Sequence, residues 1–279
     1  MNHREHRDSR RAPAEGVGGD RSAWAEASAE ALERWVAGLG ELAGFEGIEW
    51  AEYACAGVRH RLARYRHQQS GARFHLVPGA PAFRCGGDPD PYGEVTIQPL
   101  LVACAPLSGR EWRALGGSAS DDELPAGGVS WLEARARLEA AGLRLPREAE
   151  WVYFARAGVA GRYWWGGDEF DPGASWHLAN AGGGPRPARE HAERRNAFGL
   201  IDVTGNVWEW CDDDLDLAME GSAWQEGDPG KVHRGGSYDT PRRSADLEAR
   251  AGSDPRATYP DLGVRPVADL PLGAADQGV

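Results

Sequence analysis

Three histidines in the second half of the chain, His177, His191 and His233, are the residues best suited to hold a redox metal. Two imidazoles and one carboxylate form the facial iron site of non-heme oxygenases, and nearby acids include Asp239 and the run 212–214. These residues are far apart and share no predicted element, so their spacing gives no metal signature. A metal-dependent oxidoreductase or tailoring enzyme using non-heme iron or copper is kept as the alternative function. Loop histidines without a metal are the simpler interpretation.

The cysteines do not indicate thiol chemistry. The chain has four of them, Cys55, Cys85, Cys104 and Cys211, and none forms a CxxC pair. Zinc clips and disulfide frameworks need closer or more regular spacing. We therefore expect four separate, buried or idle thiols in a reducing cytoplasm.

The segment 231–250, KVHRGGSYDTPRRSADLEAR, has the composition of a binding loop and no evident nucleophile. Gly235 and Gly236 permit backbone angles that other residues avoid. An aromatic ring, arginines suited to carboxylate or phosphate, and short hydrogen-bonding side chains follow them. An ordinary solvated loop is the simpler interpretation. The predicted ligand-binding residues are Ser237, Tyr238, Asp239, Thr240, Arg242 and Arg243, with Trp164 and Trp165 as a second wall.

The composition limits the partners. The formal charge of −12 at pH 7 argues against general binding to nucleic acid or anionic membranes, which requires a basic surface. The polar first 20 residues lack the apolar stretch of a signal peptide, and no apolar run reaches the length of a membrane span. We expect a cytoplasmic protein whose partner is an unidentified protein or small-molecule ligand.

The elements that position these residues are predicted from periodicity and punctuation. Residues 58–67 and 72–79 have the pattern of two strands, joined by a turn at QQSG. Ser130 and Glu133 form a capping box ahead of one helix, and a second helix begins in LPREAEW. From Gly158 onward the pattern predicts mostly loop, with tryptophans to pack against it.

The chain divides into four predicted parts. After Asp20, the residues Trp24, Leu32 and Trp35 fall near one face of a single predicted helix. The predicted parts are a disordered arm at 1–19, a helical segment at 20–47, an α+β domain at 48–270 and a flexible tail at 271–279.

Five motifs resemble the formylglycine-generating enzyme (sulfatase-modifying factor) family. In chain order they are GGVSWLEARARLEAAGLRLPREAEWVYFARAG, RYWWGGDEF, NAFGLIDVTGNVWEWCDD, HRGGSYDTPRRS and DLGVRPV. The resemblance implies a C-type-lectin-like α+β fold with a small twisted antiparallel sheet, two helices and extensive ordered loops. The family includes copper oxidases that make formylglycine, iron sulfoxide synthases and ligand-binding proteins, so the fold alone does not fix the function.

The family's cysteine pair is missing from this chain. In the family pattern the two cysteines lie two and seven positions beyond the aromatic residue after GGS, which places them at Thr240 and Ala245. Soft sulfur ligands suit Cu(I), and a hydroxyl does not replace them. The helical bundle that carries three histidines in the sulfoxide synthases also has no counterpart before residue 50. We expect a pseudoenzyme: a ligand- or protein-recognition module of C-type-lectin type that does not form formylglycine.

A calcium site is a further implication of the resemblance. The family's positions fall on Asp202, Gly205, Val207 and Glu209 in the stretch IDVTGNVWEW. Carboxylates and backbone carbonyls are the hard oxygen donors that calcium prefers. In the simpler interpretation, Glu209 only hydrogen-bonds the turn.

Overall fold

The computed structural model describes residues 17–85, 93–215 and 229–271. Its largest sheet is antiparallel, in the order β1 (Phe45–Cys55), β2 (Val58–His67), β3 (Arg73–Val77), β6 (Leu100–Ala103) and β11 (Val267–Asp269). A second sheet has the order β10 (Leu262–Gly263), β7 (Trp208–Leu215), β8 (Gly230–Arg234) and β9 (Arg250–Ser253), while β4 (Ala80–Arg84) pairs with β5 (Glu94–Ile97). The antiparallel pairing of β2 with β3 confirms the strand pair predicted from the sequence.

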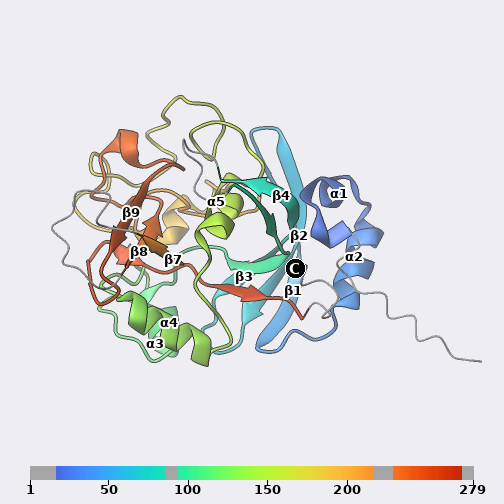
Figure 1. The fold of residues 1–279 in the computed structure, drawn as a ribbon, viewed down its shortest axis with the longest axis horizontal. Helices are drawn as coiled ribbons and strands as arrows, with labels where there is room; N and C mark the ends of the chain where they lie inside the picture. The colour runs from blue at the N-terminus through green and yellow to red at the C-terminus, as the bar shows by residue number, and fades with distance from the viewer. Residues whose placement is uncertain (1–16, 86–92, 216–228, 272–279) are drawn as a thin grey trace, which may run out of the picture.

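The helices of the described residues are short. They are α1 (Arg21–Glu26), α2 (Ala29–Gly38), α3 (Gly109–Ala114), α4 (Trp131–Ala140) and α5 (Glu148–Arg156), with 3-10 turns η2 (Val17–Gly19), η3 (Ala188–His191) and η5 (Arg242–Ser244). Helix α5 lies in the middle of the molecule, in contact with β5, β7 and β8 (Figure 1). Within the described ranges, no helix has the length and apolar character needed to cross a membrane.

Large aromatic side chains fill the space around α5. Fully buried rings include Phe74, Trp112, Trp151, Phe154 and Trp210. A buried indole N–H needs an acceptor, and Nε1 of Trp210 donates to the carbonyl of Val129 at 2.8 Å. These rings therefore pack the core and also fix neighbouring loop backbone.

The N-terminal segment contains two helices where the sequence pattern predicted one. Asp20 caps α1 by accepting from the N–H of Ser22, and Ser28 caps α2 by accepting from the N–H of Ala31. The Ser28 cap interrupts the helix because its side chain competes for the N–H groups of the next turn. The predicted arm also ends earlier than expected, since residues 17–19 form η2; residues 1–16 and the tail from 272 lie outside the described residues.

The two predicted helices of the domain are present as α4 and α5. The Oγ of Ser130 caps α4, while the carboxylate of Glu133 pairs with Arg137 at 2.7 Å and does not complete the expected capping box. At the start of α5 the other half of a capping box is present, because Oε2 of Glu150 accepts from the N–H of Arg147 at 2.8 Å.

Between α5 and β7, residues 157–207 are ordered loop with η3 as their only helix. Buried side chains hold this backbone. Nδ2 of Asn196 donates to the carbonyl of Phe154 at 2.7 Å, and its Oδ1 accepts from the N–H groups of Phe198 and Leu200 at 3.0 Å. Such bonds replace a regular ladder, and the α+β, loop-rich architecture expected from the sequence is confirmed.

Candidate functional site

The glycine pair after β8 forms a turn that other residues would not fit. Gly235 and Gly236 have φ angles of 95° and 75°, in the region that side chains rarely adopt. A Cβ at Gly235 would lie 3.0 Å from the ring of Trp151 and 3.1 Å from the carbonyl of Val203. The carbonyl of Gly235 accepts from the N–H of Gly205 at 2.8 Å, so the two sequence motifs meet here.

Thr240 and Ala245 lie against the same glycine. A Cβ at Gly236 would be 3.3 Å from Cγ2 of Thr240 and 3.3 Å from Cα of Ala245. The two positions assigned by the sequence pattern are therefore neighbours in space, on either side of the same glycine. In this chain the pair is a hydroxyl and a methyl group, and both residues are buried.

Two of the predicted ligand-binding hydroxyls are used by the loop itself. Oγ of Ser237 donates to Oδ2 of Asp261 at 2.7 Å, and Oγ1 of Thr240 accepts from the N–H of Ser237 at 2.9 Å. Both side chains are buried. They fix the loop conformation and leave Tyr238 and Asp239 as the outward-facing residues beside them.

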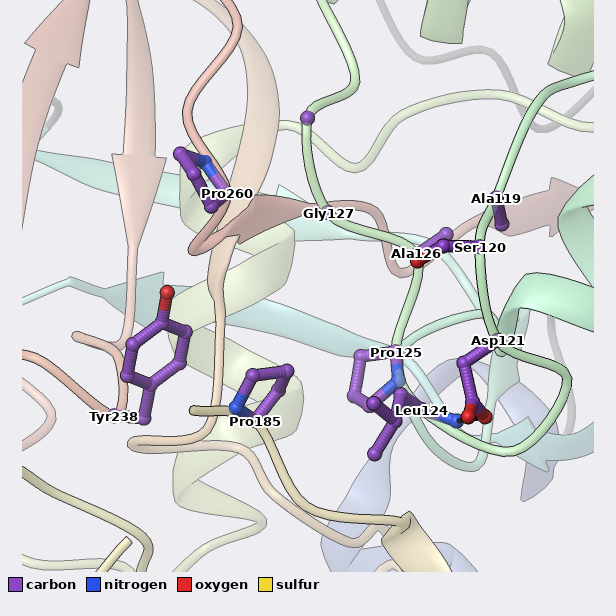
Figure 2. Close-up of a pocket in the computed structure, with 11 residues that line it drawn as sticks. Ala119, Ser120, Asp121, Leu124, Pro125, Ala126, Gly127, Pro185, Tyr238 and Pro260 are labelled. Atoms are coloured by element: carbon purple, nitrogen blue, oxygen red, sulfur yellow. Dashed lines mark hydrogen bonds between the residues drawn. The ribbon is translucent and has the colours of Figure 1, made fainter. Parts of the chain in front are cut away.

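Tyr238 lines a cavity of about 410 Å³ (Figure 2). Its phenol is half-buried, and burial, with the nearby acids Asp261 and Asp239, raises its pKa. The phenol therefore stays protonated and able to donate a hydrogen bond at neutral pH. The other lining residues are mainly apolar: Ala119, Ser120, Asp121, Leu124, Pro125, Ala126, Gly127, Gly128, Pro185 and Pro260.

The two tryptophans predicted to form a second wall, Trp164 and Trp165, differ in burial. Trp164 is 4% exposed and belongs to the core. Trp165 lies in an aromatic cluster, with its ring 6.4 Å from that of Phe170. The guanidinium of Arg242 lies 6.0 Å from the centre of the same Phe170 ring. The structure thus brings Arg242 and Trp165 together through Phe170, a residue that the sequence reasoning did not select.

The turn that carries the predicted calcium ligands is conformationally unusual. Asp202, Gly205 and Asn206 all have left-handed backbone, with φ of 53°, 74° and 62°. A Cβ at Gly205 would approach the carbonyl of Trp176 to 2.2 Å. Non-glycine residues persist in this region only where surrounding contacts enforce it.

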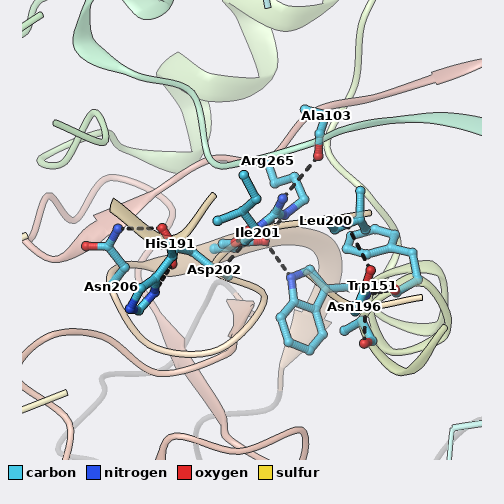
Figure 3. Close-up of polar contacts among 12 residues, drawn as sticks. Ala103, Trp151, His191, Asn196, Leu200, Ile201, Asp202, Asn206 and Arg265 are labelled. Carbon is cyan, nitrogen blue, oxygen red and sulfur yellow. Dashed lines mark hydrogen bonds and ion pairs between the residues drawn. The ribbon is translucent and has the colours of Figure 1, made fainter. Parts of the chain in front are cut away.

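Those contacts involve both carboxylates of the turn (Figure 3). Oδ1 of Asp202 is 2.9 Å from Nδ1 of His191, and Oδ2 accepts from Nδ2 of Asn206 at 2.9 Å. Glu209 accepts from Arg265 at 2.7 Å and from Nε1 of Trp151 at 2.7 Å. The side chains of Asp202, Glu209 and Arg265 are almost completely buried.

The carboxylates of Asp202 and Glu209 differ in how their charge is balanced. Burial raises the pKa of Glu209, and the guanidinium of Arg265 opposes that rise. When both carboxylates are ionised, Asp202 and Glu209 carry two negative charges against the single positive charge of Arg265. One buried negative charge is then left without a matching positive charge, and an uncompensated buried charge is strongly unfavourable.

Arg265 is the residue that sequence reasoning missed. It is 0% exposed and also donates to the carbonyls of Ala103 and Ile201 at 3.0 and 2.8 Å. A single arginine inside the apolar run LGVRPV was the available signal, since a buried arginine requires a buried acceptor.

The three histidines of the iron hypothesis have separate surroundings. His177 packs on Phe170, with 5.2 Å between the ring centres, whereas His233 packs between Trp208 and Trp210. His191 stacks on another ring and reaches Asp202. In the part of the chain that the structure describes, no three His, Cys, Asp or Glu side chains form a metal-binding group.

Comparison with other proteins gives the context of this geometry. A formylglycine-generating enzyme of Streptomyces coelicolor is 36% identical over 234 residues, covering 74% of this chain and 71% of that protein. The inactive C-alpha-formylglycine-generating enzyme 2 of Bos taurus is 33% identical over 188 residues, covering 59% of this chain and 58% of that protein.

Solved structures confirm the fold expectation. PvdO from Pseudomonas aeruginosa superposes with a TM-score of 0.61 at 20% identity, covering 74% of this chain and 98% of PvdO. Treponema denticola variable protein 1 gives a TM-score of 0.53 at 20% identity, over 79% of this chain and 99% of that one. Residues 28–270 match the model of the sulfatase-modifying factor enzyme 1-like domain. The chain belongs to this family and has its C-type-lectin-like α+β fold.

Proposed function

We propose that this chain is a recognition module that does not form formylglycine and that binds its ligand beside Tyr238. The observation that carries the proposal is the placement of Thr240 and Ala245 together against Gly236. A copper site at this point would need two thiolates, and a hydroxyl and a methyl group do not bind Cu(I). The Bos taurus relative is named an inactive formylglycine-generating enzyme, which is consistent with this loss.

The chain's own cysteines do not substitute for the missing pair. Burial raises the pKa of Cys55, Cys104 and Cys211, so these thiols remain protonated, and the thiolate is the form that binds metals and attacks substrates. Cys55, Cys104 and Cys211 form no disulfide, which supports a reducing, cytoplasmic location as part of the proposal.

The purified protein loaded with copper should leave the cysteine of a sulfatase-type peptide unchanged. The expected aldehyde signal in mass spectrometry equals that of a blank without protein, because no thiol pair is available at Thr240 and Ala245. Aldehyde above the blank would overturn the proposal. Stoichiometric iron or copper in the purified protein would favour the metal-dependent oxidoreductase.

The proposed ligand combines an apolar group with an acidic one. The Tyr238 cavity is lined by three prolines, a leucine and alanines, a surface suited to an apolar side chain with few polar contacts. Arg242 and Arg243 are exposed four and five residues further along the chain, where they can pair with a carboxylate or phosphate of the same ligand. A peptide with an apolar and an acidic residue has this chemistry.

The double change Tyr238→Ala with Arg242→Ala should remove binding and preserve the fold. Truncation of interface anchors typically costs about 2 kcal/mol or more of binding energy each. Exposed substitutions usually change stability by less than about 0.5 kcal/mol. The measurements are capture of partners from a lysate of the source cells and the melting temperature. The control is Leu132→Ala with Arg59→Ala, a matched pair of exposed residues away from the cavity.

Two outcomes would contradict this assignment. Unfolding of the Tyr238 and Arg242 double variant would make the loop structural. Normal capture by that variant would place the ligand elsewhere, with the Trp165 cluster as the next candidate.

We also propose that calcium binds at the turn, held by Asp202 and Glu209 with the carbonyls of Gly205 and Val207. The ion would supply positive charge to a buried, acidic and left-handed turn. A ligand present at a hundredfold excess over its dissociation constant adds about 2.7 kcal/mol to the free energy of unfolding. For a domain of this size, that corresponds to a change in melting temperature of roughly 5 to 10 °C.

Removal of calcium with a chelator should lower the melting temperature, and Asp202→Asn should abolish this response. Asp202 is preferable to Glu209 for the test, because loss of Glu209 would also leave Arg265 without its carboxylate. An identical melting curve with and without chelator would contradict the site. Ser244→Asn, an exposed position, is the control that should keep the response.

A further inference from the structure

A second cavity, of about 520 Å³, is lined by residues of β2 and β3 and by the start of α3. Arg66 on β2 lies opposite Arg73 on β3, and the N–H of Cys104 donates to the carbonyl of Arg73 at 2.9 Å. The three residues therefore sit side by side across neighbouring strands. The lining residues are Arg66, Ser70, Gly71, Arg73, Cys104, Ser108, Arg110, Glu111, Asp122 and Glu123.

The acidic residues of this cavity are already engaged. Arg110 pairs with Asp122 at 3.4 Å and with Glu123 at 2.8 Å. Oε2 of Glu111 accepts from the N–H and the Oγ of Ser108 at the start of α3. Burial raises the pKa of Glu111, and the nearby charges of Arg73 and Arg110 oppose that rise. The hydrogen bonds and ion pairs of these carboxylates are therefore made within their own wall, and Glu111 acts on Arg73 only at longer range.

The opposite wall carries arginines without matching acids. The guanidinium of Arg73 has no hydrogen-bond or ion-pair partner among the described residues. Arg66 has one loose contact, 3.8 Å from Glu46, with both side chains largely exposed, and such a pair contributes little. Two neighbouring guanidinium groups thus line the cavity without a close ion pair among the described residues.

A further pair of arginines adds to the positive potential. Arg64 lies two residues before Arg66 on the same face of β2. Its Nε is buried without a partner, although the guanidinium pairs with Glu49. Arg195 donates to the carbonyl of Gly199 and has no carboxylate partner among the described residues. Burial, and then the like charges of Arg73 and Arg195, lower the pKa of Arg64.

We infer that this cavity binds an oxyanion, a phosphate or carboxylate group of a small molecule, through Arg73 and Arg66. A guanidinium presents two parallel N–H donors that match such groups. The chain as a whole carries a charge of −12, so two adjacent arginines without a close ion pair are a local feature. The volume is that of a small-metabolite site.

We assign the site to binding. Cys104 is the thiol that lines the cavity, and burial raises the pKa of that thiol. A protonated thiol is a poor nucleophile. The inference is independent of the Tyr238 cavity, because the two cavities share no lining residue.

Titration calorimetry at low ionic strength with inorganic phosphate, and separately with succinate, tests the site. We expect saturable binding of at least one of them by the unmodified protein. Arg73→Gln should weaken it at least tenfold, because the unpaired guanidinium is removed. The matched control is Arg59→Gln, which carries the same charge change on the opposite face of β2, where Arg59 is exposed beside Glu52. The control should bind as the unmodified protein does.

The melting temperature separates a lost ligand contact from lost structure. Arg73 makes no hydrogen bond or ion pair among the described residues, and its removal exchanges an attraction to Glu111 for relief of repulsion with Arg64, so Arg73→Gln should melt close to the temperature of the unmodified protein. Preference for phosphate over succinate, or the reverse, identifies the source of the oxyanion. Absence of saturable binding of both, or equal weakening by Arg59→Gln and Arg73→Gln, would overturn the inference.

Discussion

Replacing Arg265 with methionine should destabilise the protein by about 3 to 5 kcal/mol, the usual effect of leaving one partner of a buried ion pair alone. Arg265 is 0% exposed and Glu209 is 1% exposed, so water does not reach the carboxylate that would be left behind. The carbonyls of Ala103 and Ile201 would also lose their donors. Urea unfolding monitored by tryptophan fluorescence measures the change.

Two variants make this prediction specific to the ion pair. Arg135→Met breaks an exposed pair with Glu139 and should change stability by less than about 1 kcal/mol. Adding Glu209→Gln to Arg265→Met removes the stranded charge and should restore part of the loss. A loss below about 1 kcal/mol for Arg265→Met alone would show that the pair is not important for the fold.

The protein should lose stability steeply as the pH falls from about 6.5 to about 4. Burial lowers the pKa of His60, His75 and His233 from 6.5 to about 4 in each case. In this window the unfolded chain binds protons that the folded protein does not bind. Stability is therefore complete above the unfolded pKa and declines below it. Each histidine changes the free energy of unfolding by up to about 1.4 kcal/mol per pH unit. The three together change it by up to about 4 kcal/mol per pH unit.

His60→Phe isolates one of these contributions. Neither ring nitrogen of His60 has a hydrogen-bond partner, and its ring centre is 4.8 Å from that of Phe198, so a phenyl ring preserves the packing. The slope of the unfolding free energy against pH should decrease by the amount that corresponds to about one proton fewer bound on unfolding. Leu132→Met, at an exposed residue without a titratable group, is the control variant. An unchanged slope for His60→Phe would mean that His60 is protonated in the folded protein.

The sequence predicted the elements that depend on local pattern. Strands β2 and β3, helices α4 and α5 and the turn at Gly235 depend on alternation, caps and glycine geometry, which operate over a few residues. The motif GLIDVTGNVWEW led to the family and therefore to the fold.

What remained hidden depends on contacts between distant residues. The pairing of Arg265 with Glu209 joins two motifs 56 residues apart. The separation of Trp164 from Trp165 is decided by which ring finds room in the core, and the dipeptide alone does not specify that. Tyr238 and Arg242 are four residues apart in the predicted loop, and they also have different neighbours. Tyr238 lines the proline-rich cavity, whereas Arg242 lies over the ring of Phe170.

The contacts of Arg265 also determine when the protein completes its folding. Its partner Ala103 lies 162 residues earlier in the chain, and β6, which contains Ala103, pairs with β11 at residues 267–269. Contacts of such sequence separation form slowly, because the intervening chain must be ordered first. During synthesis, a chain that has not yet released residues 262–269 from the ribosome lacks β10, β11 and this guanidinium. Docking of the C-terminal strand is therefore expected to be the last step of folding, after almost all of the domain has been translated.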